Sequence, residues 1–249
     1  MTRRTYGQFC AVARALDAVG ERWTLLLVRE LLLGPRRFTD LLAALPGLGT
    51  SLLAERLRNL ESLGVVHREA LPPPAGATVY RLTGSGYRLG PVVRALADWG
   101  AGLLDEPAPG EAFRADWVAL YVATSAATVT GAPAATTGTS AATATAGSTA
   151  AVPTDPQPDE TYELRVDDQT CHIRVEGGRP LAGSGPSPAA PALVIRVDRD
   201  ACIDLGLGRA DLRELVAAGR AETEGDADAL ARAARLFARG KNRPAQEKG

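Results

Sequence analysis

The stretch from Arg36 to Glu69, RRFTDLLAALPGLGTSLLAERLRNLESLGVVHRE, constrains the fold more than any other part of the chain. Two leucine-rich blocks with helical spacing flank the polar turn PGLGTS, and the second block runs directly into Val65-Val66, where the spacing becomes that of a strand. Two helices joined by a tight, glycine-containing turn are the pattern of a helix-turn-helix. A β-hairpin directly after the second helix makes this pattern a winged helix.

The same kind of pattern predicts the elements around this stretch. Apolar residues recur at helical spacing, and glycine or proline marks the ends, in four segments: Phe9–Val19, Trp23–Gly34, Phe38–Leu45 and about Thr50–Leu63. We expect Thr39 to cap the third helix, with Phe38 packed as a hydrophobic staple. Two short β-branched runs, 65–70 and 78–83, predict the hairpin. A last helix is predicted over 85–99, and its wide apolar face indicates a partner.

The second helix of the pair is predicted to have one buried and one exposed face. Leu53, Leu57 and Leu60 fall on one side and would anchor the helix to the core. The first turn of the opposite side carries small hydroxyl residues, free amides and the positive end of the helix dipole, which suit contacts with bases and phosphates. A recognition helix reads bases mainly with its N-terminal residues, so this tip is expected to enter the major groove. The candidate DNA-binding residues are Arg36, Arg37, Thr39, Thr50, Ser51, Glu55, Arg58 and Arg68, with Arg56 as an alternative to Arg58 for a phosphate contact.

Other functions of this pattern stay open. Helix pairs with glycine or proline turns are common in ordinary α-rich domains, and a winged helix can also be a protein-interaction module. Residues 1–104 carry a net charge of +5 (13 Lys+Arg, 8 Asp+Glu), whereas residues 105–249 carry −6 (15 and 21). A basic front half can approach phosphates and an acidic back half is repelled by them. The excess is modest, however, and Glu55 and Glu61 lie on the face assigned to DNA.

The composition argues against a metal centre, a disulfide framework and a membrane protein. Three cysteines and two histidines are too few and too scattered for paired disulfides or a His/Cys zinc cluster. The longest uncharged stretch, between Asp116 and Asp155, is too weakly apolar to span a membrane. Arg14 and Asp17 interrupt the only apolar run near the N-terminus, so no secretion signal is expected. We expect a cytoplasmic protein that uses no cofactor.

The second half of the chain predicts an α+β layout with an antiparallel sheet. Strands are expected in TYELRV, TCHIRVEG and ALVIRVDRDACIDL, and helices in RADLRELVAAG and DADALARAARLFARG, after a helix that starts in ADWVALYV. The Ala/Thr-rich segment 123–158 offers too little apolar surface to offset the entropy of ordering it, so we expect a flexible insertion. His172 follows Cys171, but neighbours on a strand point to opposite faces. We therefore expect no catalytic pair and no enzyme.

Several short motifs run along the first hundred residues. They are Gly20-x-x-Trp23, Arg37-Phe38, Leu53-x-x-x-Leu57-x-x-Leu60, Gly64 and Tyr80-x-Leu82-Thr83. In combination, from Cys10 to about Gly100, they resemble the HxlR-type winged-helix transcriptional regulators. The resemblance implies a homodimer, built from the first and last helices of the domain, on a pseudo-palindromic operator of double-stranded DNA. The implied dimerisation residues are Val12, Leu16, Val92, Val93, Leu96 and Trp99.

Cys10 stands where some members of that family carry a thiol sensor of oxidants or electrophiles. A sensor needs an accessible thiol with a lowered pKa, and Arg3, Arg4 and Arg14 could supply positive charge. A buried, unreactive cysteine is the commoner case, so both interpretations of Cys10 stay open.

The strands YELRV, CHIRVEGG and ALVIRVD, the segment DLRELVAAGRAETEGD and the final helix resemble the sterol-carrier-protein-2-like fold. That fold encloses an apolar cavity for lipid-like molecules, which implies a small lipophilic effector. The expected division is a winged-helix DNA-binding and dimerisation domain at 1–104, a sterol-carrier-like domain at 105–240 with the insertion at 123–158, and a tail at 241–249.

We therefore expect a homodimeric DNA-binding regulator, in its simplest form a repressor, that responds to a lipophilic ligand or to thiol modification. The alternative is a lipid-binding or carrier protein whose winged helix only contacts other proteins. An enzyme with an acyl or lipid substrate is a third hypothesis, and no catalytic constellation in the sequence supports it.

Overall fold

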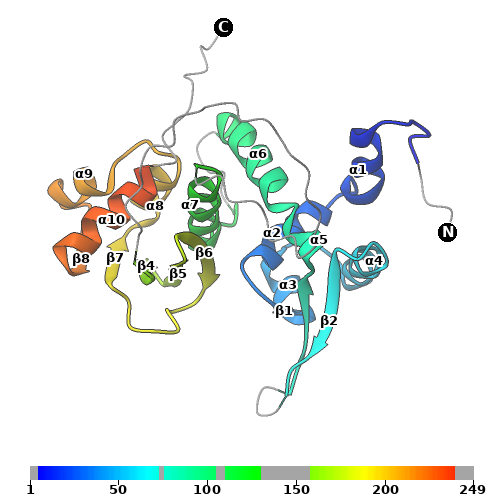
Figure 1. Cartoon of the computed structure of the whole chain (residues 1–249), viewed down its shortest axis with the longest axis horizontal. Helices are drawn as coiled ribbons and strands as arrows, with labels where there is room; N and C mark the ends of the chain where they lie inside the picture. The colour runs from blue at the N-terminus through cyan, green and yellow to red at the C-terminus, as the bar shows by residue number, and fades with distance from the viewer. Residues whose placement is uncertain (1–4, 73–75, 105–109, 130–157, 239–249) are drawn as a thin grey trace, which may run out of the picture.

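The computed structural model describes residues 5–72, 76–104, 110–129 and 158–238, and for 126–129 it describes the backbone alone. A front half, residues 5–104, and a back half, residues 110–238, each contain a hydrophobic core of their own. The two halves lie side by side, with helix α6 of the front half next to α7 of the back half (Figure 1). The expected α+β class is confirmed.

The front half is a winged helix. Its three strands pair in the order β1-β3-β2, and both pairs are antiparallel. In chain order its elements are α1 (Ala11–Val19), α2 (Thr24–Leu32), β1 (Arg36–Arg37), α3 (Phe38–Ala44), α4 (Thr50–Ser62), β2 (Val66–Ala70), β3 (Thr78–Leu82), α5 (Gly84–Tyr87), α6 (Gly90–Gly100) and a 3-10 turn (Ala101–Leu103).

Helix α4 is anchored as its leucine spacing predicts. Leu53, Leu57 and Leu60 are all at most 1% exposed, and they pack in the front core with residues of α2, α3 and the hairpin. Gly64 follows the helix with a φ of 65°, a left-handed conformation that glycine adopts without a Cβ penalty. The chain can therefore turn from α4 into β2 within three residues.

Two details of the front half differ from the sequence prediction. Thr39 is not the cap of α3. The chain pairs with β3 as far as Arg37, and the helix begins at the next residue, Phe38. Arg37 is therefore the N-cap residue, and its amide donates to Asp40 Oδ2 at 3.0 Å. The single helix expected over 85–99 is two helices. Thr83 Oγ1 accepts from the Gly86 amide and starts the short α5, and Pro91 starts α6 in the first turn, where a missing N–H costs nothing.

The back half is a five-stranded sheet with helices packed on it. The strand order is β6-β5-β4-β7-β8. Alternate residues of β4, namely Tyr162, Leu164 and Val166, are fully buried in a core shared with α7, α8, α9 and α10. The elements are α7 (Ala115–Val129), β4 (Glu160–Val166), β5 (Gln169–Glu176), β6 (Arg179–Ser184), β7 (Leu193–Val197), α8 (Arg199–Gly206), α9 (Leu212–Ala217), β8 (Ala221–Gly225) and α10 (Ala227–Ala238).

The back half also corrects parts of the sequence prediction. The sheet is mixed, because β7 pairs with β4 in parallel, and the edge strands β6 and β8 were not predicted. The strand expected in ALVIRVDRDACIDL ends before Asp198, which caps α8 by accepting from the Ala201 amide at 2.6 Å. Helix α7 runs to Val129, so the segment 123–158 begins as helix. The rest of that insertion, 130–157, and the tail at 241–249 lie outside the described residues.

Helices α6 and α7 are joined by polar contacts. Arg94 Nη1 donates to the Tyr121 carbonyl at 2.9 Å, and its guanidinium stacks 4.1 Å from the Tyr121 ring centroid. The Tyr121 hydroxyl donates to Asp98 Oδ1 at 2.7 Å. These bonds tie the helix that ends the front half to the helix that begins the back half.

Candidate nucleic-acid interface

The N-terminus of α4 lies open at the surface. Gly49 precedes the helix without a side-chain cap, and Thr50 and Ser51 in the first turn are exposed. The first amides of a helix have no partner within it, so without a capping side chain they stay available to an external acceptor. A DNA phosphate or a base edge suits this position, because the helix dipole is positive there.

The exposed face of α4 carries one cation without an internal partner. Arg58 is exposed and forms no ion pair with any residue that the structure describes. Glu55 is also exposed, but its Oε1 accepts from Arg56 Nη1 at 2.8 Å, which offsets its negative charge. The face that the sequence assigns to DNA is therefore less acidic than its residue types indicate.

Arg56 has a structural position instead. It is 9% exposed, and it donates to Glu21 Oε2 at 3.1 Å and to the Arg22 carbonyl at 3.3 Å. These bonds hold α4 to the loop before α2. Of the two arginines that the sequence left as alternatives for a phosphate, only Arg58 is free to reach one.

Arg37 and Arg36 are neighbours with different surroundings. Arg37 and Thr39, at the start of α3, are exposed. The Arg36 side chain is only 17% exposed and points to the back half, where Nη2 donates to Ser184 Oγ at 2.5 Å and lies 3.6 Å from Asp116 Oδ2. Adjacent residues of β1 point to opposite faces, so Arg36 is a contact between the halves and does not belong to the candidate DNA surface.

The hairpin β2–β3 forms the wing and projects from the body of the front half (Figure 1). Arg68 on β2 is exposed, and its guanidinium lies 5.7 Å from the Tyr80 ring centroid. Residues 73–75 of the proline-rich tip lie outside the described residues. Arg68 is thus placed on the strand of the wing and not at its tip.

A second surface of the front half is apolar and exposed. Helix α1 stands apart from the front core (Figure 1), and its residues Val12 and Leu16 are 67% and 43% exposed. On α6, Leu96 and Trp99 are 47% and 64% exposed, whereas Val93 packs on the front core. The exposed large apolar residues on and beside these helices are Tyr6, Phe9, Val12, Leu16, Val92, Leu96, Trp99, Leu103 and Leu104. Tyr6 and Phe9 were not among the predicted dimerisation residues; the first helix was expected from Phe9, but α1 begins at Ala11, so both residues precede it.

Of the three cysteines, one is exposed and two are buried. Cys10 is exposed just before α1, and hydrogen bonds with the amides of Ala13 and Val12 lower the pKa of its thiol. Arg14 lies 3.7 Å from Asp17, and residues 3 and 4 lie outside the described residues, so the backbone is the source of the shift. Cys171 and Cys202 are buried, and burial raises both pKa values, that of Cys202 to about 12. Only Cys10 has the access and the lowered pKa that a reactive thiol needs.

The back half shows no catalytic arrangement around His172. Its Nδ1 lies 3.0 Å from the Gly185 carbonyl oxygen, and its ring packs over Gly183, where a Cβ would meet it at 2.4 Å. Cys171 points to the opposite, buried face of β5. In the part of the chain that the structure describes, three or more His, Cys, Asp or Glu side chains nowhere gather closely enough to hold a metal ion. No helix within the same residues is long and apolar enough to cross a bilayer.

Comparisons with known proteins agree with this geometry. Residues 18–107 match the model of the HxlR-like helix-turn-helix family. The chain is 36% identical over 100 residues to an uncharacterised HTH-type transcriptional regulator, sll1512, of Synechocystis, a match that covers 40% of this chain and 74% of the relative. It is 38% identical over 92 residues to the HTH-type transcriptional regulator YvaP of Bacillus subtilis, covering 37% of this chain and 85% of YvaP. The solved reduced form of the regulator YodB from B. subtilis is 29% identical, with a TM-score of 0.35, over 41% of this chain and 100% of that one.

The family match spans the elements described above, from the end of α1 through the helix-turn-helix and the wing to α6. Both relatives exceed 30% identity over more than two thirds of their own length. The chain belongs to the HxlR-like helix-turn-helix family of DNA-binding transcriptional regulators.

Proposed function

We propose that the chain acts as a homodimer whose two α4 helices enter successive major grooves of a pseudo-palindromic operator. The observation that carries this proposal is the uncapped first turn of α4, with Thr50 and Ser51 exposed above a fully buried leucine face. A helix held this way presents its N-terminal residues to base edges while its other face stays in the core.

The proposed contacts divide by chemistry. Thr50 and Ser51 are short hydroxyl residues that let the helix approach the bases closely. Arg37 and Arg58 are exposed cations on both sides of the turn and would bind phosphates, with Thr39 beside them, while Arg68 would bind a phosphate from the wing. Glu55, on the same face, would lie beside the groove with its charge offset by Arg56.

The dimer is proposed to form through α1 and α6. Val12 and Leu16 on α1 and Val92, Leu96 and Trp99 on α6 expose large apolar side chains to solvent in the single chain. Val93 packs on the front core and would support this face from below. A two-fold axis through these helices would set the spacing of the two α4 helices. The dimer would repress transcription by occluding promoter DNA.

We propose two inputs to the regulator, a small lipophilic effector and modification of Cys10. Either one acts only if it favours one arrangement of the two α4 helices over the other. The thiol of Cys10 lies immediately before α1, so a group added to it would stand at the proposed dimer contact.

The back half is proposed to be a sterol-carrier-like domain spanning about 105–240 that senses a ligand or supports the dimer, beside a front domain at 1–104. Its mixed five-stranded sheet covered by helices supports this assignment. We propose no catalytic role for it, and we place the protein in the cytoplasm with its DNA.

Selection of bound duplexes from a pool of random sequences, with the full chain, tests this function. We expect enrichment of two inverted half-sites whose centres are about 10 bp apart, or a multiple of that spacing. Light scattering of the free protein is expected to give the mass of two chains. Enrichment of a single half-site would contradict the homodimer, and no enrichment of any sequence would favour the lipid-carrier alternative.

A further inference from the structure

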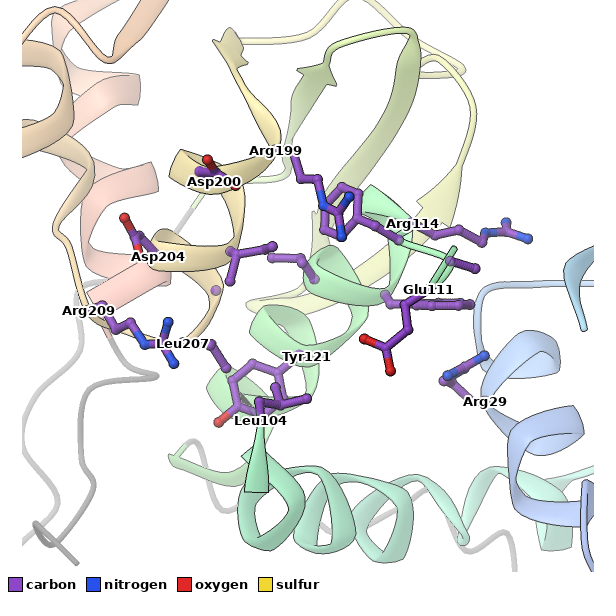
Figure 2. Close-up of a pocket in the computed structure, with 16 residues that line it drawn as sticks. Arg29, Leu104, Glu111, Arg114, Tyr121, Arg199, Asp200, Asp204, Leu207 and Arg209 are labelled. Carbon is purple, nitrogen blue, oxygen red and sulfur yellow. The ribbon is translucent and has the colours of Figure 1, made fainter. Parts of the chain in front are cut away.

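A cavity of about 900 Å³ lies between the two halves. Arg29 of α2 and Leu104 reach it from the front half (Figure 2). The segment 111–114, the helices α7 and α8, and residues 207 and 209 after α8 supply the rest. Its volume is in the range of small-molecule sites. The lining residues that bear on what the cavity can bind are aromatic, aliphatic or cationic: Phe113, Trp117, Tyr121, Arg199, Ile203 and Leu207.

The cavity is separate from the core of the back half. Helix α7 turns Ala119 and Val122 toward the sheet, whereas Trp117 and Tyr121, on its other side, line the cavity. Helix α8 likewise buries Cys202 in the core and lines the cavity with Arg199 and Ile203, among others. The space therefore lies on the outer side of α7 and α8 and not between these helices and the sheet.

The aromatic side chains of the cavity already hold cations. The guanidinium of Arg29 lies 3.8 Å from the Trp117 ring centroid, and that of Arg199 lies 5.3 Å from the Phe113 ring centroid. Arg94 covers a face of Tyr121 in the same way. A cationic ligand would have to compete with these arginines for the rings, so the wall does not suit one.

Most charges around the cavity are balanced by neighbours. Arg29 and Arg114 bind Glu30 and Asp116. Asp204 lies 3.2 Å from Arg220. The other acidic groups of the lining, Glu111 and Asp200, are exposed at its edge.

Arg199 differs from these groups. Its Nε is buried without a hydrogen-bond partner, and it forms no ion pair with a residue in the described ranges. Its side chain extends from the start of α8 into the cavity (Figure 2), and its guanidinium lies over the Phe113 ring. A partly buried guanidinium without a carboxylate favours an anion, because a charged hydrogen bond would satisfy its free donors.

We propose that this cavity binds an aromatic, largely apolar molecule that carries one carboxylate or sulfonate group. The anion pairs with Arg199, and the apolar body lies along Trp117, Ile203 and Leu207. The ligand is held mainly by burial of apolar area, and the single ion pair selects anionic molecules over neutral ones of the same shape.

The cavity also touches the connection to the helix-turn-helix. Arg29, in its wall, binds Glu30 at 2.9 Å, and Trp117, whose ring Arg29 covers, donates to the same carboxylate at 2.8 Å. Both front-half residues belong to α2, which leads through β1 into α3 and α4. A ligand that shifts Arg29 or Trp117 therefore acts on the element that positions the recognition helix. This regulatory part rests on the proposed function, whereas the binding site does not.

Two fluorescent probes of similar shape test the site on the full-length protein. 1-Anilinonaphthalene-8-sulfonate carries one sulfonate on an apolar aromatic body, and N-phenyl-1-naphthylamine has the same rings without the sulfonate. We expect the wild type to bind the sulfonate about tenfold more tightly than the neutral probe. Arg199→Gln is expected to remove that difference and to leave the neutral probe bound as before. Arg213→Gln, which changes an exposed arginine on α9, should bind both probes like the wild type.

The proposal is overturned if Arg199→Gln leaves the preference for the sulfonate unchanged, if it weakens both probes equally, or if the wild type has no preference. Regulation is measured separately, as the affinity for a selected operator with and without the sulfonate. Coupling must be reciprocal, so the operator should change the affinity for the probe by the same factor. Probe binding without operator binding would refute the DNA-binding proposal and leave the site intact; operator binding that the probe does not change would refute the regulatory part alone.

Discussion

The indole Nε1 of Trp117 donates a hydrogen bond of 2.8 Å to Oε1 of Glu30 and so joins the two halves of the chain. Glu30 is fully buried, and its other partners are Arg29 at 2.9 Å and Arg114 at 3.6 Å. Burial lowers the pKa of Arg114, but its contacts with Asp116 and Glu30 outweigh burial, and the net pKa lies above its ordinary value. A buried carboxylate with two arginines and an indole fixes α2 against α7.

Replacing Trp117 by Phe should destabilise the protein. The change removes a hydrogen bond to a buried charge, which typically contributes about 2 kcal/mol to the free energy of unfolding. Urea unfolding followed by circular dichroism measures the loss. Tyr87→Phe, at a side chain that is 48% exposed and lies outside the proposed dimer surface, should change the free energy by less than about 0.5 kcal/mol. Equal effects of the two substitutions would mean that the bond to Glu30 does not hold the halves together.

Arg56→Ala and Arg58→Ala should separate stability from DNA binding on one helix. Arg56 ties α4 to Glu21 and the Arg22 carbonyl, and its loss should cost about 1 kcal/mol of unfolding free energy, since Glu21 is partly exposed. Arg58 has no such contacts and its loss should leave unfolding unchanged. Urea midpoints for both variants test the contrast. The assignment of roles fails if Arg58→Ala is the more destabilising of the two.

Leu96→Glu should convert a dimer into a monomer. A carboxylate on the apolar surface of α6 would be buried without a partner in the dimer, at a cost that exceeds the contribution of one contact residue. Light scattering after gel filtration gives the mass. Leu181→Glu is the matched control, because Leu181 on the edge strand β6 is equally exposed, at 47%. A monomeric wild type, or a dimeric Leu96→Glu variant, would contradict the dimer surface.

Cys10 should be the first cysteine to react with iodoacetamide. The amides of Ala13 and Val12 lower the pKa of its thiol, so the thiolate and the reaction rate should rise with pH and reach half-maximum below the pKa of an ordinary cysteine. Cys171 and Cys202, with raised pKa values, should react only after unfolding. Mass spectrometry of peptides across a pH series identifies the labelled residue. Labelling of Cys171 or Cys202 at the rate of Cys10 in the folded protein would refute this assignment, and Cys10→Ser should abolish the fast reaction.

Local sequence patterns were sufficient for the helix-turn-helix and the wing. The spacing of Leu53, Leu57 and Leu60 and the turn at Gly64 are encoded within fifteen residues, so both the buried face and the end of α4 could be predicted. The same holds for β4 and β5, which alternate clearly. The edge strands β6 and β8 could not be predicted, because glycine, proline and charged residues weaken their alternation, and pairing with β5 and β7 determines them.

The prediction of site residues failed where the contacts join residues that are far apart in the sequence. Arg36 looked like a phosphate contact because arginines before a helix often are, but its partners are Asp116 and Ser184, far along the chain. Thr39 is of a residue type that often caps helices, but here it lies inside α3. Arg37 pairs with β3 and is itself the N-cap, so the helix begins at Phe38. The cavity at Arg199 combines residues from 29 to 209, and only the packing of α7 and α8 beside α2 brings them together.

The central claim is that α4 binds DNA with its exposed first turn. The most direct measurement is fluorescence anisotropy of a labelled operator, titrated over a salt series with the wild type, a Ser51→Ala/Arg58→Ala variant and Arg213→Ala as the control. We predict that the double variant binds at least about tenfold more weakly and has a shallower dependence of log affinity on log salt, by about one for each phosphate that a subunit no longer binds. Arg213→Ala should match the wild type. Unchanged affinity and salt dependence in the Ser51→Ala/Arg58→Ala variant would contradict the account.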